Sequence, residues 1–143
     1  MRLTAVAVVA LGLASPAAAG VPDPCALLTN MEVAGQLGSK VSSRTHSNGG
    51  YVCTWTAGGR LTLKVTVWTP TKEQFELGAH APPRPVRVLG VGQEAYESRG
   101  KAPFLLVWQE GVALRVDTSL TTEPGRVEQA LARVAVSRIS GRS

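Results

Sequence analysis

Two cysteines and two histidines are the side chains best suited to covalent or metal chemistry in this chain of 143 residues. Outside the cytosol, an even and minimal cysteine count indicates one intramolecular disulfide, here between Cys25 and Cys53. Closing a loop of that size would contribute about 3 kcal/mol to stability. The alternative is a reactive thiol, which needs a base beside it. The spacing of His46 and His80 singles out neither histidine as that base.

Motifs for cofactor, metal or nucleophilic chemistry are incomplete. With both cysteines in a disulfide, two histidines leave too few ligands for a metal site, so we expect no metal and no cofactor. Gly90-x-Gly92 resembles part of a phosphate loop but lacks the third glycine and the Lys-Ser/Thr pair, and a turn or bulge is the better interpretation. No serine stands in a Gly-x-Ser-x-Gly context. We therefore expect a protein that is not an enzyme, with no catalytic residue.

Carboxylates keep an enzymatic alternative open, because a pair of them can supply general acid and base. The candidates are Glu73, Glu76, Glu94, Glu97, Glu110 and Asp117. Glu73 and Glu76 are three residues apart, a spacing typical of a solvated helix face. The alternative function is a small hydrolase or transferase acting on an envelope substrate. A deep pocket lined by Glu94, Glu97 or His46 would favour it, and a flat surface would count against it.

Tryptophans suggest a binding surface. Trp55 lies two residues after Cys53, shares its sheet face and is expected in the core. Trp68 has the opposite parity to the apolar residues of the segment 61–68 and so points to the other face of the sheet. Either the last helix covers that face, or Trp68 is exposed. The candidate binding surface consists of Thr62, Lys64, Thr66 and Trp68. A half-buried tryptophan at the edge of the core is the alternative.

The elements that must position these residues follow from local signals. A capping box at Thr29 begins a helix that ends at Gly38, and Thr71 caps a short helix over 70–77. Polar residues over 42–50 predict a flexible loop, with room for a short strand at its start. Hairpins are predicted for 51–56 with 61–68, and for 104–108 with 112–117. A strand interrupted by glycines covers 86–96, and an amphipathic helix covers 124–139.

This order, α-β-β-α-β-β-β-α, predicts the α+β class. We expect one antiparallel twisted sheet built from two hairpins, covered on one face by the N-terminal and C-terminal helices. Residues 20–143 form a single domain in this interpretation, because 143 residues are too few for two.

The N-terminus has the three parts of a secretory signal: Arg2, an apolar run from Leu3 to Ala14, and small residues at Ala17 and Ala19. We expect residues 1–19 to be a signal peptide cleaved after Ala19, which places the protein outside the cytoplasm. A membrane anchor is the alternative, but the run is shorter than a bilayer requires. Lipid attachment at Cys25 is a second alternative, but two prolines and an aspartate before that cysteine do not suit the cleavage site it requires.

Charge does not indicate nucleic-acid binding. The formal net charge is +5, but the basic residues are scattered singly among acidic ones. A solvated, mildly basic surface explains this pattern, and weak attraction to anionic wall polymers or membrane surfaces is the alternative.

Four motifs occur together after residue 20: Asp23-Pro24-Cys25-Ala26-Leu27-Leu28-Thr29-x-x-Glu32-Val33, Leu37-Gly38, Cys53-x-Trp55 and Gly90-Val91-Gly92-Gln93-Glu94-Ala95-Tyr96. This set resembles a family of actinobacterial exported proteins and lipoproteins classified only as a domain of unknown function. The resemblance implies a conserved cysteine pair, which supports the bridge from Cys25 to Cys53, and it supplies no catalytic residue. Many members resemble lipoproteins, whereas this chain lacks a lipobox.

Together these observations predict a secreted, non-enzymatic interaction domain that acts at the cell envelope or outside it. It would be a monomer without stable membrane insertion, and its partner would be a protein or an envelope component. An inhibitor or accessory subunit of a secreted enzyme is a further alternative.

Overall fold

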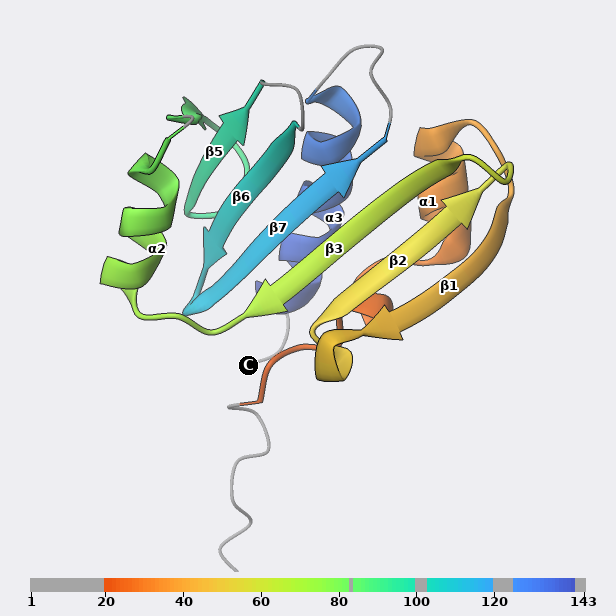
Figure 1. Ribbon diagram of the computed structural model, residues 1–143. Helices are drawn as coiled ribbons and strands as arrows, with labels where there is room; N and C mark the ends of the chain where they lie inside the picture. Colours follow the sequence, from red (N-terminus) through yellow and green to blue (C-terminus); the bar gives the residue numbers. More distant parts are fainter. Residues whose placement is uncertain (1–19, 83, 100–102, 120–124, 141–143) are drawn as a thin grey trace, which may run out of the picture.

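The computed structural model describes residues 20–82, 84–99, 103–119 and 125–140. The expected signal peptide, residues 1–19, lies outside them. The described chain forms a seven-stranded antiparallel sheet in the order β1-β2-β3-β7-β6-β5-β4 (Figure 1). The strands are β1 (Val41–Ser47), β2 (Val52–Ala57), β3 (Leu61–Trp68), β4 (Val86–Val88), β5 (Glu94–Ser98), β6 (Phe104–Gln109) and β7 (Val112–Thr118). The α-helices are α1 (Asn30–Leu37), α2 (Lys72–His80) and α3 (Arg126–Ser140), and short 3-10 turns occur at η2 (Pro24–Ala26) and η3 (Asn48–Gly50). The α+β class is therefore confirmed.

Both predicted hairpins are present. In the first, β2 and β3 pair up to Ala57 and Leu61, and the turn places Gly58 and Gly59 at φ of 58° and 76°. Residues with a side chain rarely adopt this left-handed backbone conformation, whereas glycine adopts it without steric cost. In the second, β6 pairs with β7 across a tight turn at Glu110 and Gly111. Local turn chemistry thus fixes the two hairpins that carry the centre of the sheet.

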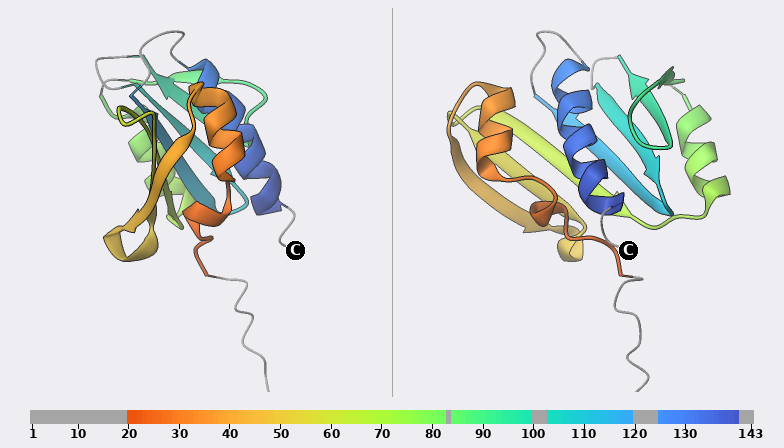
Figure 2. Two further views of the ribbon diagram at one scale, coloured as in Figure 1. Left: turned by 90° about the vertical axis from the view of Figure 1, so that its right-hand side faces the viewer. Right: turned by 180° about the vertical axis from the view of Figure 1, so that it is seen from behind.

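The main core lies between one face of the sheet and the helices α1 and α3 (Figure 2). Alternation along β3 directs Leu63, Val65 and Val67 into this layer, where each is fully buried. Trp55 is also fully buried there, as expected. The N-terminal and C-terminal helices cover this face, which confirms that part of the predicted arrangement.

Helices α1 and α2 begin directly after their predicted capping residues, but α2 ends at His80 and not at the predicted residue 77. Thr29 and Thr71 each form a capping box, with Glu32 and Gln74 respectively. Gly38 ends α1 at φ 74°, in the left-handed conformation of a glycine C-cap. The described part of the last helix begins at Arg126, and the predicted start at 124 lies outside the described residues.

Helices α1 and α3 are joined by an ion pair between Glu32 and Arg138. The guanidinium Nη1 lies 2.7 Å from Glu32 Oε2 and 2.6 Å from the Leu27 carbonyl oxygen, and Nη2 reaches Glu32 Oε1. Hydrogen bonding to Arg138 lowers the pKa of Glu32 to about 2. The same carboxylate accepts the Thr29 N–H at 2.8 Å, so one side chain both caps α1 and ties it to α3.

Three further predicted details are wrong. The segment 42–50, expected to be a loop, contains a full edge strand, β1, which pairs with β2. The segment 86–96 is a pair of antiparallel strands, β4 and β5, and not one interrupted strand. Helix α2 packs on the face opposite α1 and α3, because Phe75 contacts Tyr96 and Trp108, so helices cover both faces.

No helix among the described residues is long and apolar enough to cross a bilayer.

The glycine pair at 90 and 92 has a structural role that can be tested. Both residues have positive φ, 79° and 58°. A Cβ at Gly92 would lie 2.6 Å from Val107 Cγ1 and 2.9 Å from the Trp108 carbonyl oxygen, whereas one at Gly90 would meet nothing within 4 Å. The loop can approach β6 closely only because residue 92 has no side chain.

We expect Gly92→Ala to lower the free energy of unfolding by roughly 2–4 kcal/mol, since left-handed strain and steric overlap add. Gly90→Ala is the matched control and should cost about 1 kcal/mol, from backbone conformation alone. Denaturant unfolding followed by tryptophan fluorescence measures both values. Equal losses for the two variants would contradict the proposed close approach.

Candidate functional site

The predicted disulfide between Cys25 and Cys53 is present, and it joins the η2 turn to β2. Both cysteines are buried, and no free cysteine occurs among the described residues. A reactive thiol therefore receives no support from this arrangement. The bridge fixes the N-terminal segment against the inner face of the sheet, where η2 contacts β1, β2 and β3.

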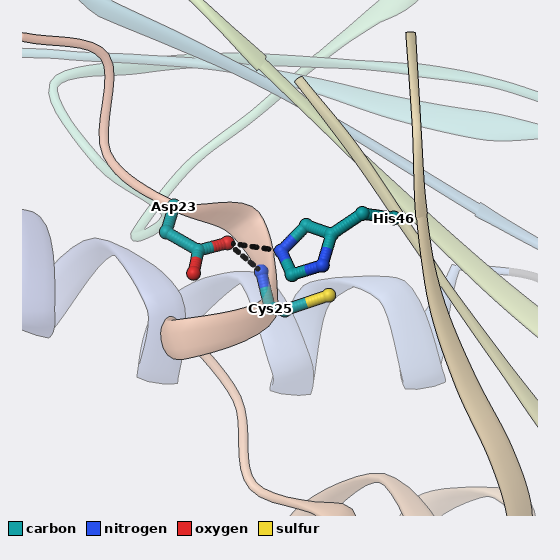
Figure 3. Close-up of side chains that lie close together, drawn as sticks. All are labelled: Asp23, Cys25 and His46. Atoms are coloured by element: carbon teal, nitrogen blue, oxygen red, sulfur yellow. Dashed lines mark hydrogen bonds and ion pairs between the residues drawn. The ribbon is translucent and has the colours of Figure 1, made fainter. Parts of the chain in front are cut away.

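A hydrogen-bonded aspartate and histidine, Asp23 and His46, lie directly beside Cys25 (Figure 3). Asp23 caps η2, and its Oδ1 accepts the Cys25 N–H at 2.9 Å. The same oxygen is 2.8 Å from Nε2 of His46, which stands opposite Cys53 in the pairing of β1 with β2. Hydrogen bonding to His46 holds the pKa of Asp23 below its ordinary value. Sequence reasoning missed this pair because it assigned His46 to a loop.

The predicted binding residues lie on the sheet face that points away from α1 and α3. In Figure 1 no helix lies over β1, β2 and β3 on this side. We call the outward-facing side chains of these strands and of neighbouring β7 the open half-face. By strand register its members are Ser43, Thr45, Ser47, Val52, Thr54, Thr56, Thr62, Lys64, Thr66, Arg115 and Asp117, and of these Val52 is buried. Hydroxyl groups dominate this surface, and a shallow hollow of about 310 Å³ lies over it, lined in part by Thr54, Thr62 and Lys64.

The open half-face carries two cations, Lys64 and Arg115, and one anion, Asp117, so its net charge is only +1. Arg115 donates from Nε and Nη2 to Asp117 at 3.0 Å, and its guanidinium stacks 4.0 Å from the Phe104 ring centroid. Lys64 stands directly opposite Asp117 in the pairing of β3 with β7. Because opposite charges are neighbours, this surface has no strong field of either sign.

Trp68 lies at the border of the open half-face and is half-buried. Its strand partner is Ala113, and it packs against a second apolar cluster under α2 that includes Phe75, Tyr96 and Leu106. Helix α3 covers the other face of the sheet. The predicted surface is thus divided: Thr62, Lys64 and Thr66 line its open part, while Trp68 belongs partly to the cluster under α2.

Glu94 belongs to an ionic network along the same cluster. It accepts hydrogen bonds from Lys72 Nζ and from the Tyr96 hydroxyl. Hydrogen bonding to Lys72 is the main cause that lowers the pKa of Glu94 to about 2, and burial raises the pKa of Tyr96 to about 12. The Lys72 ammonium also lies 5.0 Å from the Trp108 ring centroid. Glu94 is therefore fully engaged in holding α2 on the sheet.

Glu97 is buried beside a second buried carboxylate, Glu128 of α3. Glu128 accepts the Gly125 N–H at 3.0 Å, and a Cβ at Gly125 would overlap Glu97 Oε1. Arg99 Nε reaches Glu97 Oε2 at 3.2 Å, but the Oε1 atoms of both glutamates are buried without a hydrogen-bond partner. Burial is the main cause that raises the pKa of Glu128, with smaller contributions from the charges of Glu97 and Asp117.

The residues proposed for a hydrolase are thus far apart in the sheet. His46 lies on β1 at one edge, whereas Glu94 and Glu97 lie on β5, next to the opposite edge strand. The open hollow beside His46 contains Asp23 and neither of these glutamates among its described lining residues. His46 is thus not brought together with Glu94 or Glu97, whereas Glu76 and Glu94 both contact Lys72.

Comparisons with protein-family models, with curated proteins and with solved structures found no match to this chain.

The buried glutamate pair leads to a prediction with a definite pH sign. A raised pKa means that folding favours the protonated form of Glu128, so its carboxyl costs stability as pH rises above the ordinary value of 4.5. We expect Glu128→Gln to raise the free energy of unfolding at pH 7 by about 1–2 kcal/mol, because the neutral amide removes a buried charge that the Glu97 carboxylate repels. Near pH 4, below the ordinary pKa of 4.5, the carboxyl is mostly protonated in both states and the gain should be much smaller.

Denaturant unfolding at pH 4 and pH 7 measures this difference. Glu73→Gln, at an exposed carboxylate of α2, is the control and should change stability by less than about 0.5 kcal/mol. Destabilisation by Glu128→Gln at pH 7 would contradict the assignment.

Proposed function

We propose that this chain is an extracytoplasmic, non-enzymatic binding domain whose ligand is a polyhydroxylated polymer of the cell envelope. The observation that carries this proposal is the open half-face, a hydroxyl-rich surface on three neighbouring strands that no helix covers. The disulfide from Cys25 to Cys53 supports a location outside the cytoplasm, as does the signal peptide expected in residues 1–19.

The chemistry of the open half-face suits a glycan better than an apolar partner. Threonine and serine hydroxyls both donate and accept hydrogen bonds, as sugar hydroxyls do. Thr62 and Thr66 sit on β3, whose alternate side chains are packed in the core, so the backbone holds these hydroxyls in fixed positions. Trp68, half-buried at the border, supplies an aromatic edge to which a sugar ring can pack.

The low net charge and the small apolar area of the open half-face also favour a glycan ligand. Lys64 and Arg115 both neighbour Asp117, so an anionic polymer gains little net attraction here. The large apolar side chains on this side of the sheet, such as Leu106 and Phe104, belong to the cluster under α2. The open half-face therefore lacks the apolar centre on which tight protein interfaces depend.

Co-sedimentation with purified insoluble peptidoglycan tests the proposal. The sacculi are used as isolated and after removal of their phosphate polymers, and we expect the wild-type protein to sediment with both. Combining Thr62→Ala with Thr66→Ala should weaken binding about tenfold, since two hydrogen-bonding groups are lost at a cost of roughly 0.5–1.5 kcal/mol each.

Thr69→Ala is the matched control, because Thr69 is exposed and lies just beyond β3. Thr69→Ala should bind as the wild type does. All variants should have the same denaturant midpoint of unfolding as the wild type. No sedimentation of the wild type would overturn the glycan ligand. Binding that survives the double substitution would place the site elsewhere, and binding only to untreated sacculi would indicate an anionic polymer.

A further inference from the structure

We propose that Cys25, Cys53, His46 and Asp23 form a metal site of the zinc type when the disulfide is reduced. In the oxidised protein the two sulfurs are bonded to each other. Only the aspartate and the histidine then remain as ligands, which is too few for a stable site. The disulfide would thus exclude the metal, and reduction would create the site. This inference does not depend on the proposed glycan binding.

The donor atoms already converge. A carboxylate oxygen of Asp23, a ring nitrogen of His46 and Sγ of Cys25 all lie within 4.8 Å of one another. Donors placed about 2.0–2.3 Å from a tetrahedral metal ion are separated by roughly 3.3–3.8 Å, so small side-chain rotations bring these three onto one ion. Cys53 lies outside this group of three, but its sulfur is bonded to that of Cys25 in the oxidised protein, so a side-chain rotation after reduction would bring it in as the fourth donor.

The backbone elements that carry the four donors are packed together. His46 on β1 stands opposite Cys53 on β2, and this pairing continues over most of both strands. Cys25 lies on η2, and Asp23 caps this turn and is oriented by the Cys25 N–H. These hydrogen bonds do not involve the sulfurs, so reduction alone leaves them in place. A site held on paired strands and a capped turn is better ordered than one on a free loop.

An entry path is also present. The side chains of His46 and Asp23 are 51% and 54% exposed, and a hollow of about 370 Å³ opens beside them. The two cysteines lie behind this pair and are buried. A metal ion can therefore reach the imidazole and the carboxylate first, and then the thiolates, without unfolding of the sheet.

The redox step is thiol–disulfide exchange with a dithiol reductant. The reductant delivers two electrons and two protons, the sulfur–sulfur bond breaks, and the reductant leaves as its own disulfide. Metal binding then displaces the two protons from the cysteine thiols. His46 Nε2 exchanges its hydrogen bond to Asp23 for a bond to the metal, and the imidazole proton resides on Nδ1. Two thiolates, one imidazole and one carboxylate form a donor set that suits Zn²⁺.

Metal titration of the full chain in both redox states tests this proposal. The protein is reduced with a dithiol, freed of reductant under anaerobic conditions and titrated with Zn²⁺ against a chromogenic chelator. We expect one Zn²⁺ per reduced chain and no comparable binding by the oxidised chain. Co²⁺ in place of Zn²⁺ should give the visible bands of a tetrahedral site and a thiolate charge-transfer band.

Substitutions distinguish Zn²⁺ binding at the proposed four-ligand site from Zn²⁺ binding by the two reduced cysteines alone. His46→Asn and Asp23→Asn should each weaken Zn²⁺ binding by the reduced chain about tenfold or more. His80→Asn is the matched control, because His80 is the second histidine, lies on α2 and should leave affinity unchanged. Each variant is also compared with the wild type in thermal unfolding of the oxidised form.

Each outcome decides the matter. If the reduced chain loses its fold without metal, Zn²⁺ should restore the circular dichroism spectrum of the wild type and fail to restore that of His46→Asn. Equal Zn²⁺ affinity in wild type and His46→Asn would overturn the site, as would equal binding by oxidised and reduced chains. Absence of stoichiometric binding by the reduced wild type would overturn it as well.

Discussion

The pairing of β3 with β7 is the contact on which the rest of this structure depends. It joins the N-terminal strands β1, β2 and β3 to the C-terminal strands β4 to β7, and it runs from Leu63 opposite Thr118 to Trp68 opposite Ala113. Without it the sheet would separate into two smaller sheets and expose two further edges, at β3 and β7. Because side chains alternate along both strands, this single register also decides which residues face α1 and α3 and which face away.

Core and open half-face are therefore two consequences of one constraint. If Leu63, Val65 and Val67 are buried under the helices, Thr62, Lys64 and Thr66 must point outward. A slip of one residue would exchange the two sets, burying a lysine and exposing valines, at a high cost in free energy. This is why a surface can be assigned to β3 from sequence alone, although its ligand cannot.

What could be predicted from sequence is what local chemistry determines. Capping boxes at Thr29 and Thr71, the glycine turn at 58–59 and the alternation in 61–68 each act within a few residues. Strand β1 could not be recognised, because its side chains after Val41 are all exposed and show no apolar alternation. Its pairing with β2 creates the contact between His46 and Asp23. Likewise, only tertiary packing brings Glu97 of β5 against Glu128 of α3, so no spacing could indicate that pair.

The N-terminal layer is held by two attachments of different chemical kind. The disulfide ties η2 to β2 and is insensitive to proton concentration, whereas the pair of Glu32 with Arg138 ties α1 to α3 through charge. Since the pKa of Glu32 is lowered to about 2, its stabilisation is complete above the ordinary value of 4.5 and is lost as pH falls toward 2. Acid alone therefore leaves η2 bound to the sheet, and reduction alone leaves α1 bound to α3. The two attachments of this layer therefore respond to different conditions: acid weakens the pair of Glu32 with Arg138, and a reductant breaks the disulfide.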